Sequence, residues 1–226
     1  MTAKERLAAA ARGDATDQKP LILWPKALPQ LQSSEADGWV VDSAQDLAAA
    51  RSLSSEYAVL SSVLSPFGWA LQQKSPLISL LDSDPKAGDL ELQRLKQLTL
   101  EEARARMDEG ADGLCYMLAG ASPEHTTPMQ YGGFFLDLDR EILEEFKEAE
   151  FNLVWVKGNK EPYLEFVSDL PCQALSWDMK ATGIQPGSIR PYRTGAIAGS
   201  SPDCDIYLFD RVMEPDHLAA ALEATR

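Results

Sequence analysis

The stretch that decides the fold is residues 152–178, NLVWVKGNKEPYLEFVSDLPCQALSWD. A short apolar run, LVWV, is followed by a polar turn with glycine, an amphipathic segment and a second apolar run, CQALSW. Strand, turn, helix and strand in this order predict a βαβ unit of a parallel sheet. Function in such sheets lies in the loops that leave the carboxyl ends of the strands. We therefore expect five residues at the functional edge: Lys157, Asn159, Ser176, Trp177 and Asp178.

The rest of the chain extends the same alternation in both directions. Expected strands cover residues 21–24, 39–41, 58–64, 113–118, 153–156, 172–177, 194–198 and 205–209. Expected helices cover residues 2–12, 43–54, 89–109, 139–148 and 215–225, and residues 76–87 resemble a turn-rich insertion. The connections on either side of the seventh strand are too short for full helices. Eight strands that mostly alternate with helices predict a compact α/β protein, a (β/α)8 TIM barrel formed by one domain over residues 1–226.

Composition excludes several kinds of partner. The net charge of −14 argues against binding to nucleic acid or to an anionic membrane. We find no export leader and no long uncharged apolar run, so a cytoplasmic protein is expected. The three cysteines, Cys115, Cys172 and Cys204, lie in apolar strand patterns, and we interpret them as buried reduced thiols.

Four motifs resemble the uroporphyrinogen decarboxylase superfamily, which also contains cobalamin- and coenzyme-M-type methyltransferases. These motifs are KERLAAAARGDATDQKPLILWP at residues 4–25, SPFGWAL at 65–71, EGADG at 109–113 and ALSWD at 174–178. The resemblance implies a TIM barrel, an anionic substrate such as a tetrapyrrole or another carboxylate, and decarboxylase-like (carboxy-lyase) activity in porphyrin biosynthesis. Methyl transfer is the second activity that it implies, and it also allows a homodimer.

The positions that match the family's functional residues differ in chemistry. Lys26 is the only cation where the decarboxylases have an arginine-rich loop, and Asp42 is a loose counterpart of their aspartate that contacts pyrrole nitrogens. The family's tyrosine, serine and histidine fall on Gln72, Met117 and Arg211. None of these replacements keeps the original chemistry. The chain is therefore either an enzyme with altered catalytic residues or a barrel that has lost catalysis and binds a ligand or a protein.

Cations and aromatic rings are expected together at the strand ends. The cations are Lys26, Lys157 and Arg211, and the rings are Trp24, Trp69, Tyr116, Tyr131 and Trp177. Together they suit a flat anionic ligand, which would be held by charge-assisted hydrogen bonds and stacking. Alternatively, the tryptophans pack the barrel and the cations pair with Asp178 and Asp210.

We assign candidate roles on this basis. The candidate substrate-binding residues are Lys26, Trp24, Trp69, Tyr116, Asn159 and Arg211. The candidate catalytic residues are Asp178, Lys157 and His125. His125 is the only histidine placed for acid–base work, although a lone histidine in a loop is often merely solvated. Asp178 could orient Lys157, or the two could form a structural ion pair.

We predict no cofactor and no catalytic zinc. The superfamily's methyltransferases hold zinc with a His-x-Cys pair at the end of the fifth strand and another cysteine near the C-terminus. Here the residues that match the pair are Trp155 and Lys157. Neither an indole nor an ammonium group replaces these ligands. Elemental analysis after purification without chelators should find far less than one zinc per chain. About one zinc per chain would contradict this prediction.

Overall fold

The computed structural model describes residues 1–24, 36–53, 55–200 and 206–209. The strands are β1 (Leu21–Leu23), β2 (Gly38–Val41), β3 (Ala58–Leu64), β4 (Gly113–Leu118), β5 (Leu153–Val156), β6 (Ala174–Asp178), β7 (Ala196–Ser200) and β8 (Ile206–Phe209). The longer helices are α1 (Ala3–Arg12), α2 (Ala44–Leu53), α3 (Pro66–Gln73), α4 (Leu77–Ser83), α5 (Pro85–Asp108) and α7 (Leu136–Glu145). The short helices are α6 (Pro128–Gln130), η2 (Tyr131–Phe135), α8 (Leu164–Val167), α9 (Met179–Thr182), α10 (Pro186–Ile189) and η3 (Arg190–Tyr192).

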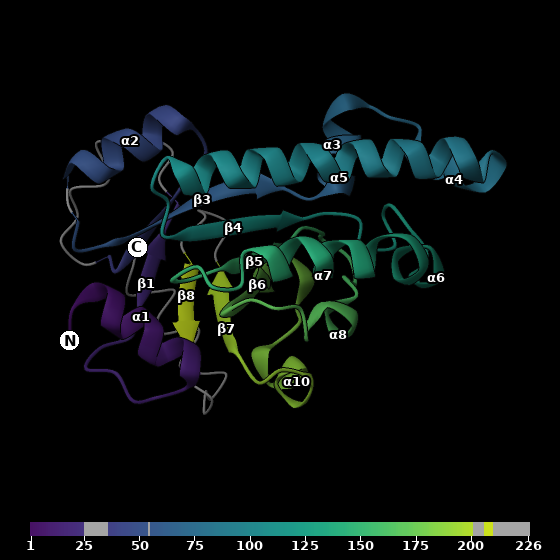
Figure 1. Cartoon of the computed structure of the whole chain (residues 1–226). Helices are drawn as coiled ribbons and strands as arrows, with labels where there is room; N and C mark the ends of the chain where they lie inside the picture. Colours follow the sequence, from purple (N-terminus) through teal and green to yellow (C-terminus); the bar gives the residue numbers. More distant parts are fainter. Residues whose placement is uncertain (25–35, 54, 201–205, 210–226) are drawn as a thin grey trace.

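Seven parallel strands form a curled sheet in chain order, β1 to β7 (Figure 1). The eighth strand pairs with β7 and with β1, so it bridges the two edges of this sheet, but it is antiparallel to both. The expectation of eight parallel strands is therefore confirmed for seven and wrong for β8. Only residues 201–205 separate β7 from β8, and a parallel neighbour needs a crossover of a dozen residues or more.

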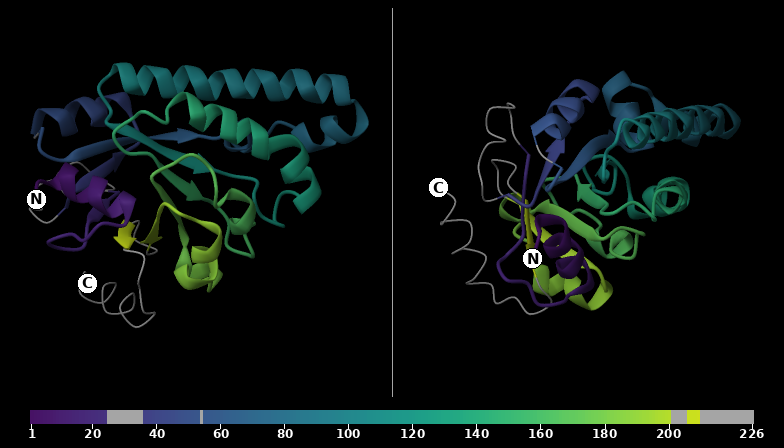
Figure 2. Two further views of the ribbon diagram at one scale, coloured as in Figure 1. Left: turned by 60° about the horizontal axis from the view of Figure 1, so that its bottom comes forward. Right: turned by 60° about the vertical axis from the view of Figure 1, so that its left-hand side comes forward.

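The first helix closes the amino-terminal end of the barrel. Thr2 caps α1 in a capping box with Glu5, and Gly13 ends the helix at a φ of 75°, as the Thr-to-Gly pattern predicts. Leu7 and Ala10 of α1 pack in one buried cluster with the inward-facing residues of the strands. Figure 2 shows α1 beside β7 and β8.

Residues 76–87 differ from the expected turn-rich insertion, because they are almost wholly helical. They form α4 and the first turn of α5. Pro85 occupies the first turn of α5, where a missing amide costs nothing, and the Asp84 side chain caps that helix through the amide of Ala87. Leu77 and Leu81 are buried against the core. Asp84-Pro85, which resembles a turn, therefore begins a helix.

Four strands, β2, β4, β5 and β6, are each directly preceded by a polar residue. The side chain of this residue links the strand to its neighbour at the amino-terminal edge of the sheet. Each of these side chains accepts a hydrogen bond from a backbone amide at the start of the preceding strand or directly before it: Asp37 from Leu21 (2.8 Å), Asp112 from Val59 (2.8 Å), Asn152 from Leu114 (2.9 Å) and Gln173 from Asn152 (2.6 Å). Buried amides need such partners. This edge of the sheet is thus fixed by side chains as well as by the ladder.

No helix among the described residues has both the length and the apolar character needed to cross a membrane.

Because Gly113 has no side chain, the start of β4 can lie against the backbone of Phe151, which precedes β5. A substitution at Gly113 tests this close approach. A Cβ atom at this position would lie 1.9 Å from the carbonyl oxygen of Phe151. We expect Gly113→Ala to lower the free energy of unfolding by at least about 2 kcal/mol through overpacking. Gly187→Ala is the matched control, because a Cβ there meets no atom within 4 Å. Urea unfolding checks both variants, and equal stability of the two would contradict the close approach.

Candidate functional site

The carboxyl ends of the parallel strands bring several predicted residues to one edge. Asp42, Ser65 and Lys157 directly follow β2, β3 and β5, and Asp178 ends β6. Lys26 and Arg211 lie outside the described residues. The eighth strand does not share this orientation, because its last residue, Phe209, pairs with Ile197 near the start of β7. The expectation that the carboxyl end of β8 lies at the same edge is therefore wrong.

A carboxylate held by an indole and a hydroxyl lies at this edge. The Nε1 of Trp24 donates to both carboxylate oxygens of Asp42, at 3.0 and 3.1 Å. The Oγ of Ser62 donates to Oδ1 of the same carboxylate at 2.6 Å. The Trp155 ring lies 6.1 Å from the Trp24 ring and nearly perpendicular to it, at 89°. We call Trp24, Asp42, Ser62 and Trp155 the Asp42 cluster.

The Asp42 cluster faces the interior of the barrel and is open to solvent. Trp24 and Trp155 border the buried interior cluster that contains Ile22 and Leu153, and Asp42 is exposed. Trp24 and Ser62 fix the carboxylate of Asp42 from two sides. An ionised carboxylate accepts up to about four hydrogen bonds, so Asp42 can accept a further one from a ligand. An exposed carboxylate next to two indoles can bind a group that donates N–H bonds and stacks on aromatic rings.

Ser176 adds a hydroxyl beside Trp155. The two residues are register partners on β5 and β6, so their side chains point to the same side of the sheet. Ser176 is fully buried, and its Oγ has no hydrogen-bond partner within the part of the chain that the structure describes. The sequence places Ser176 at this edge, but Ser62 was missed. Ser62 could have been found because it lies two residues after Leu60, whose side chain belongs to the buried interior cluster.

Four aromatic residues expected at the mouth face outward instead: Trp69, Tyr116, Tyr131 and Trp177. The Tyr131 hydroxyl donates to Oδ2 of Asp139 at 2.9 Å behind the sheet. The Tyr116 hydroxyl donates to Oδ1 of Asp139 at 2.6 Å behind the sheet, and Trp177 Nε1 donates to the carbonyl oxygen of Ile184 at 3.1 Å. Trp69 packs against the main core outside the barrel. Strand residues alternate between the two faces, so Tyr116 and Trp177 point away from the interior that Met117 and Ser176 face.

Lys157, Asn159 and His125 belong to two loops, after β5 and after β4, and their environments differ. Lys157 is exposed, and within the described residues no ion pair joins it to Asp178. The backbone amide of Asn159 donates to Glu124 Oε2 at 3.2 Å, which ties the β5 loop to the β4 loop. His125 is exposed, with its ring 5.7 Å from that of Phe67.

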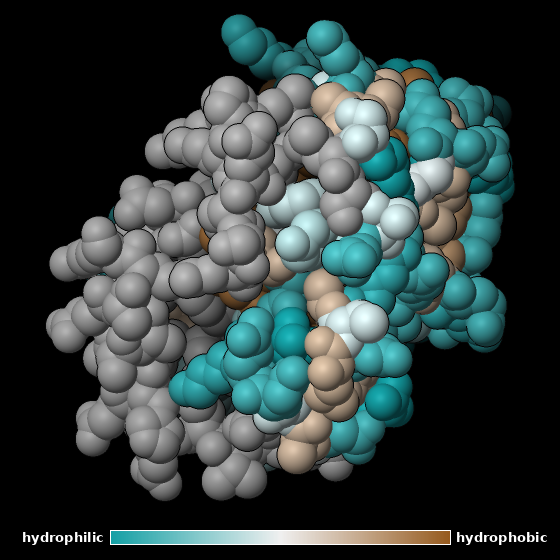
Figure 3. All heavy atoms as spheres, turned by 90° about the vertical axis from the view of Figure 1, so that its left-hand side faces the viewer, coloured by the Kyte–Doolittle hydropathy of each residue, from teal (hydrophilic) through white to brown (hydrophobic). Residues whose placement is uncertain are grey.

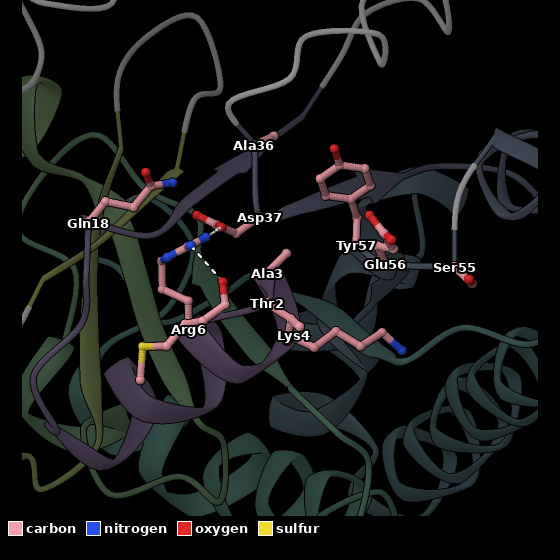
Figure 4. Close-up of a pocket in the computed structure, with 11 residues that line it drawn as sticks. Thr2, Ala3, Lys4, Arg6, Gln18, Ala36, Asp37, Ser55, Glu56 and Tyr57 are labelled. Atoms are coloured by element: carbon pink, nitrogen blue, oxygen red, sulfur yellow. Dashed lines mark hydrogen bonds and ion pairs between the residues drawn. The ribbon is translucent and has the colours of Figure 1, made fainter.

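A polar hollow lies at the opposite, amino-terminal end of the barrel. It has a volume of about 480 Å³ and includes Arg6, Asp37 and Tyr57 in its wall (Figure 4). The surface seen from this side is mostly hydrophilic in its described part (Figure 3). Arg6 binds Asp37 and also Asp17, at 2.6 Å, and the guanidinium holds the pKa of the Asp17 carboxyl well below its usual range. Because these charges already have partners, we interpret the hollow as structural.

No group of three or more histidine, cysteine or acidic residues with the placement of a metal site occurs among the described residues. Cys115 is buried in the barrel interior, and Cys172 is half-buried.

Asp178, a candidate catalytic residue, also makes a structural contact. Its Oδ1 accepts the amide of Ala181 at 2.8 Å and so caps α9. We expect Asp178→Ala to cost about 1 kcal/mol of stability, and Asp178→Asn to cost much less because asparagine caps equally well. Urea unfolding measures both. If alanine and asparagine are equivalent, the cap contributes nothing and the role of Asp178 must lie elsewhere.

Comparisons with known proteins agree with the fold but name no activity for this chain. No protein-family model matches the sequence, and no curated protein matches it either. Among solved structures, the chain is similar to a methyltransferase from Methanosarcina mazei, with a TM-score of 0.74 and 13% sequence identity. The match covers 89% of this chain and 84% of that chain. At this identity, the similarity shows a shared α/β barrel fold.

Proposed function

We propose that this protein binds a flat, N–H-bearing polycarboxylate, such as a tetrapyrrole, at the carboxyl end of its barrel. The observation that carries the proposal is the Asp42 carboxylate, which is fixed by Trp24 and Ser62 and remains exposed. A carboxylate in this position accepts N–H bonds from the centre of such a ligand. The resemblance of the sequence to the uroporphyrinogen decarboxylase superfamily supports the same class of ligand.

The surroundings of Asp42 supply the other contacts that this ligand needs. Trp24 and Trp155 offer ring faces and edges for stacking, which contributes about 0.5–1.5 kcal/mol beyond the burial of area. Lys157 follows β5 at the same edge and is exposed, so its ammonium group can pair with a peripheral carboxylate. In this arrangement, the carboxylates of the ligand lie at its periphery, where Lys157 can bind one of them. The N–H groups of the ligand lie at its centre, next to Asp42.

The reaction follows from what these residues can do. Asp42 can stabilise the positive charge of a pyrrole ring that has taken up a proton, and Lys157 can hold the carboxylate beside it. Loss of carbon dioxide then returns the electron pair of the broken bond to the ring, and a proton from solvent takes the place of the carboxyl group. A carboxy-lyase with altered catalytic residues is therefore our first candidate. Methyl transfer is the second, favoured by the shared fold with a methyltransferase. A barrel that binds its ligand without turnover is the third.

Binding is tested by calorimetry with a tetrapyrrole polycarboxylate. We expect Asp42→Asn and Lys157→Met each to weaken binding about 10-fold to 100-fold, because a hydrogen bond to a charged group contributes about 1.5–3 kcal/mol. Lys160→Met is the matched control, since Lys160 is an exposed cation of the same loop but is not assigned to the ligand. Equal affinity of all four proteins would contradict the proposed site.

Turnover separates the three candidates. Release of carbon dioxide from the bound polycarboxylate identifies the lyase, and methylation of an acceptor identifies the transferase. Binding with neither product identifies the binding module.

A further inference from the structure

A second acidic group, Asp139, is buried behind the sheet and has no part in the proposed site. Its Oδ1 accepts the Tyr116 hydroxyl of β4 at 2.6 Å, and its Oδ2 accepts the Tyr131 hydroxyl of η2 at 2.9 Å. Asp139 itself belongs to α7 and is 2% exposed, and both tyrosines are fully buried. One carboxyl group thus joins three elements in the core.

The charged groups on the elements around Asp139 have other partners. Arg140, the next residue of α7, binds Asp169 at 2.9 and 3.0 Å. Two further cations, on α5, bind acidic residues of α7 on its outer surface: Lys96 binds Glu141 and Arg104 binds Glu145. Tyr163 contacts the ring of Tyr131, and its hydroxyl donates to the Thr126 carbonyl oxygen. Within the described residues, Asp139 is therefore bound by two neutral hydroxyls and by no cation.

Neither protonation state of this group is fully satisfied. The ionised carboxylate keeps both tyrosine bonds but is a charge buried without a counter-ion, which is costly. The neutral acid removes the charge, but it must donate its own proton, so one tyrosine hydroxyl has to accept and its hydrogen loses its partner. Burial raises the pKa of Asp139 to about 7, although both tyrosine bonds act to lower it.

The same contacts anchor the segment of residues 119–135, which leaves the carboxyl end of β4 and carries His125. Thr126 Oγ1 donates to the Gly120 carbonyl oxygen at 2.6 Å, and Thr126 in turn accepts from Tyr163 at 2.5 Å. At its far end, the segment forms the π-helical turn η2, where Tyr131 binds Asp139. Such turns occur often at functional sites.

We propose that Asp139 is a proton-binding latch, which holds residues 119–135 closed against the core when protonated and loosens them when its proton is lost. The sign follows from linkage. An opened segment would let water reach Asp139 and return its pKa to the ordinary range near 3.9. Closing the segment then takes up a proton. Protonation therefore stabilises the closed form relative to the open form fully below about pH 4, and this stabilisation is lost as the pH rises through 7. Within that window the opening constant should rise about tenfold per pH unit, and it should level off above pH 7.

Carbon-13 NMR of the aspartate carboxyl groups in the whole protein tests the proton site directly. We expect one carboxyl signal, absent from Asp139→Asn, to titrate near pH 7. Tyr131→Phe should move the midpoint upward, because it removes a donor that favours the ionised form. Tyr163→Phe is the matched control: it removes a neighbouring hydroxyl that bonds Thr126 and not Asp139, so the midpoint should stay. A midpoint below pH 5 in the wild type would overturn the proposal.

Hydrogen exchange tests the latch. Opening of residues 119–135, corrected for the intrinsic pH dependence of exchange, should increase about 50-fold between pH 5 and pH 7 in the wild type. Asp139→Asn keeps the shape and cannot titrate, so its opening should be independent of pH. Peptides from residues 38–53, at β2 and α2, serve as an internal control. The same pH profile in the wild type and in Asp139→Asn would overturn the latch, even if the carboxyl group titrates near pH 7.

Discussion

The fold depends on polar side chains that sit immediately before a strand and bind the backbone amide of the strand before it. Asp37, Asp112, Asn152 and Gln173 do this at the amino-terminal edge. A curled parallel sheet leaves amides at its strand starts, and an unpaired buried amide costs about as much as a lost hydrogen bond. These side chains remove that cost and fix each strand against its neighbour. Arg193 uses a related device, since its guanidinium donates to the carbonyl oxygens of Ala196, Ser168 and Cys172.

The two ends of the barrel consequently differ in what they can do. At the amino-terminal end, α1 covers the strands, Arg6 binds two carboxylates, and the polar groups are used for packing. At the carboxyl end, Asp42 is positioned by two donors and stays accessible. The packing contacts and the proposed site therefore lie at opposite ends of the barrel axis, which is the usual arrangement in such barrels.

Strand positions were predictable from the sequence because apolar runs end at glycine, proline and aspartate. The expected limits of β3, β4 and β5 agree with the structure. The direction of β8 could also have been inferred, since the SSPD turn is too short for a crossover. Residues 76–87 could not be recognised as helical from turn residues alone, because Pro85 serves equally well in a turn and in a first helical turn.

The candidate site was less predictable, for two physical reasons. Proximity to a strand end does not determine which face a side chain occupies, so Tyr116 and Trp177 were placed at the mouth although they point outward. The Asp42 cluster joins residues 18 and 20 positions apart, and no local pattern contains such contacts. Lys26 and Arg211 lie outside the described residues, and their part in the site stays a prediction.

The most direct measurement of the central claim is a crystal structure of the protein with a bound tetrapyrrole polycarboxylate. The account predicts ligand density against the Trp24 and Trp155 rings, with pyrrole nitrogens within hydrogen-bond distance of the Asp42 carboxylate. Density in the hollow beside Arg6 and Tyr57, or density at the carboxyl end that makes no contact with Asp42, would contradict it.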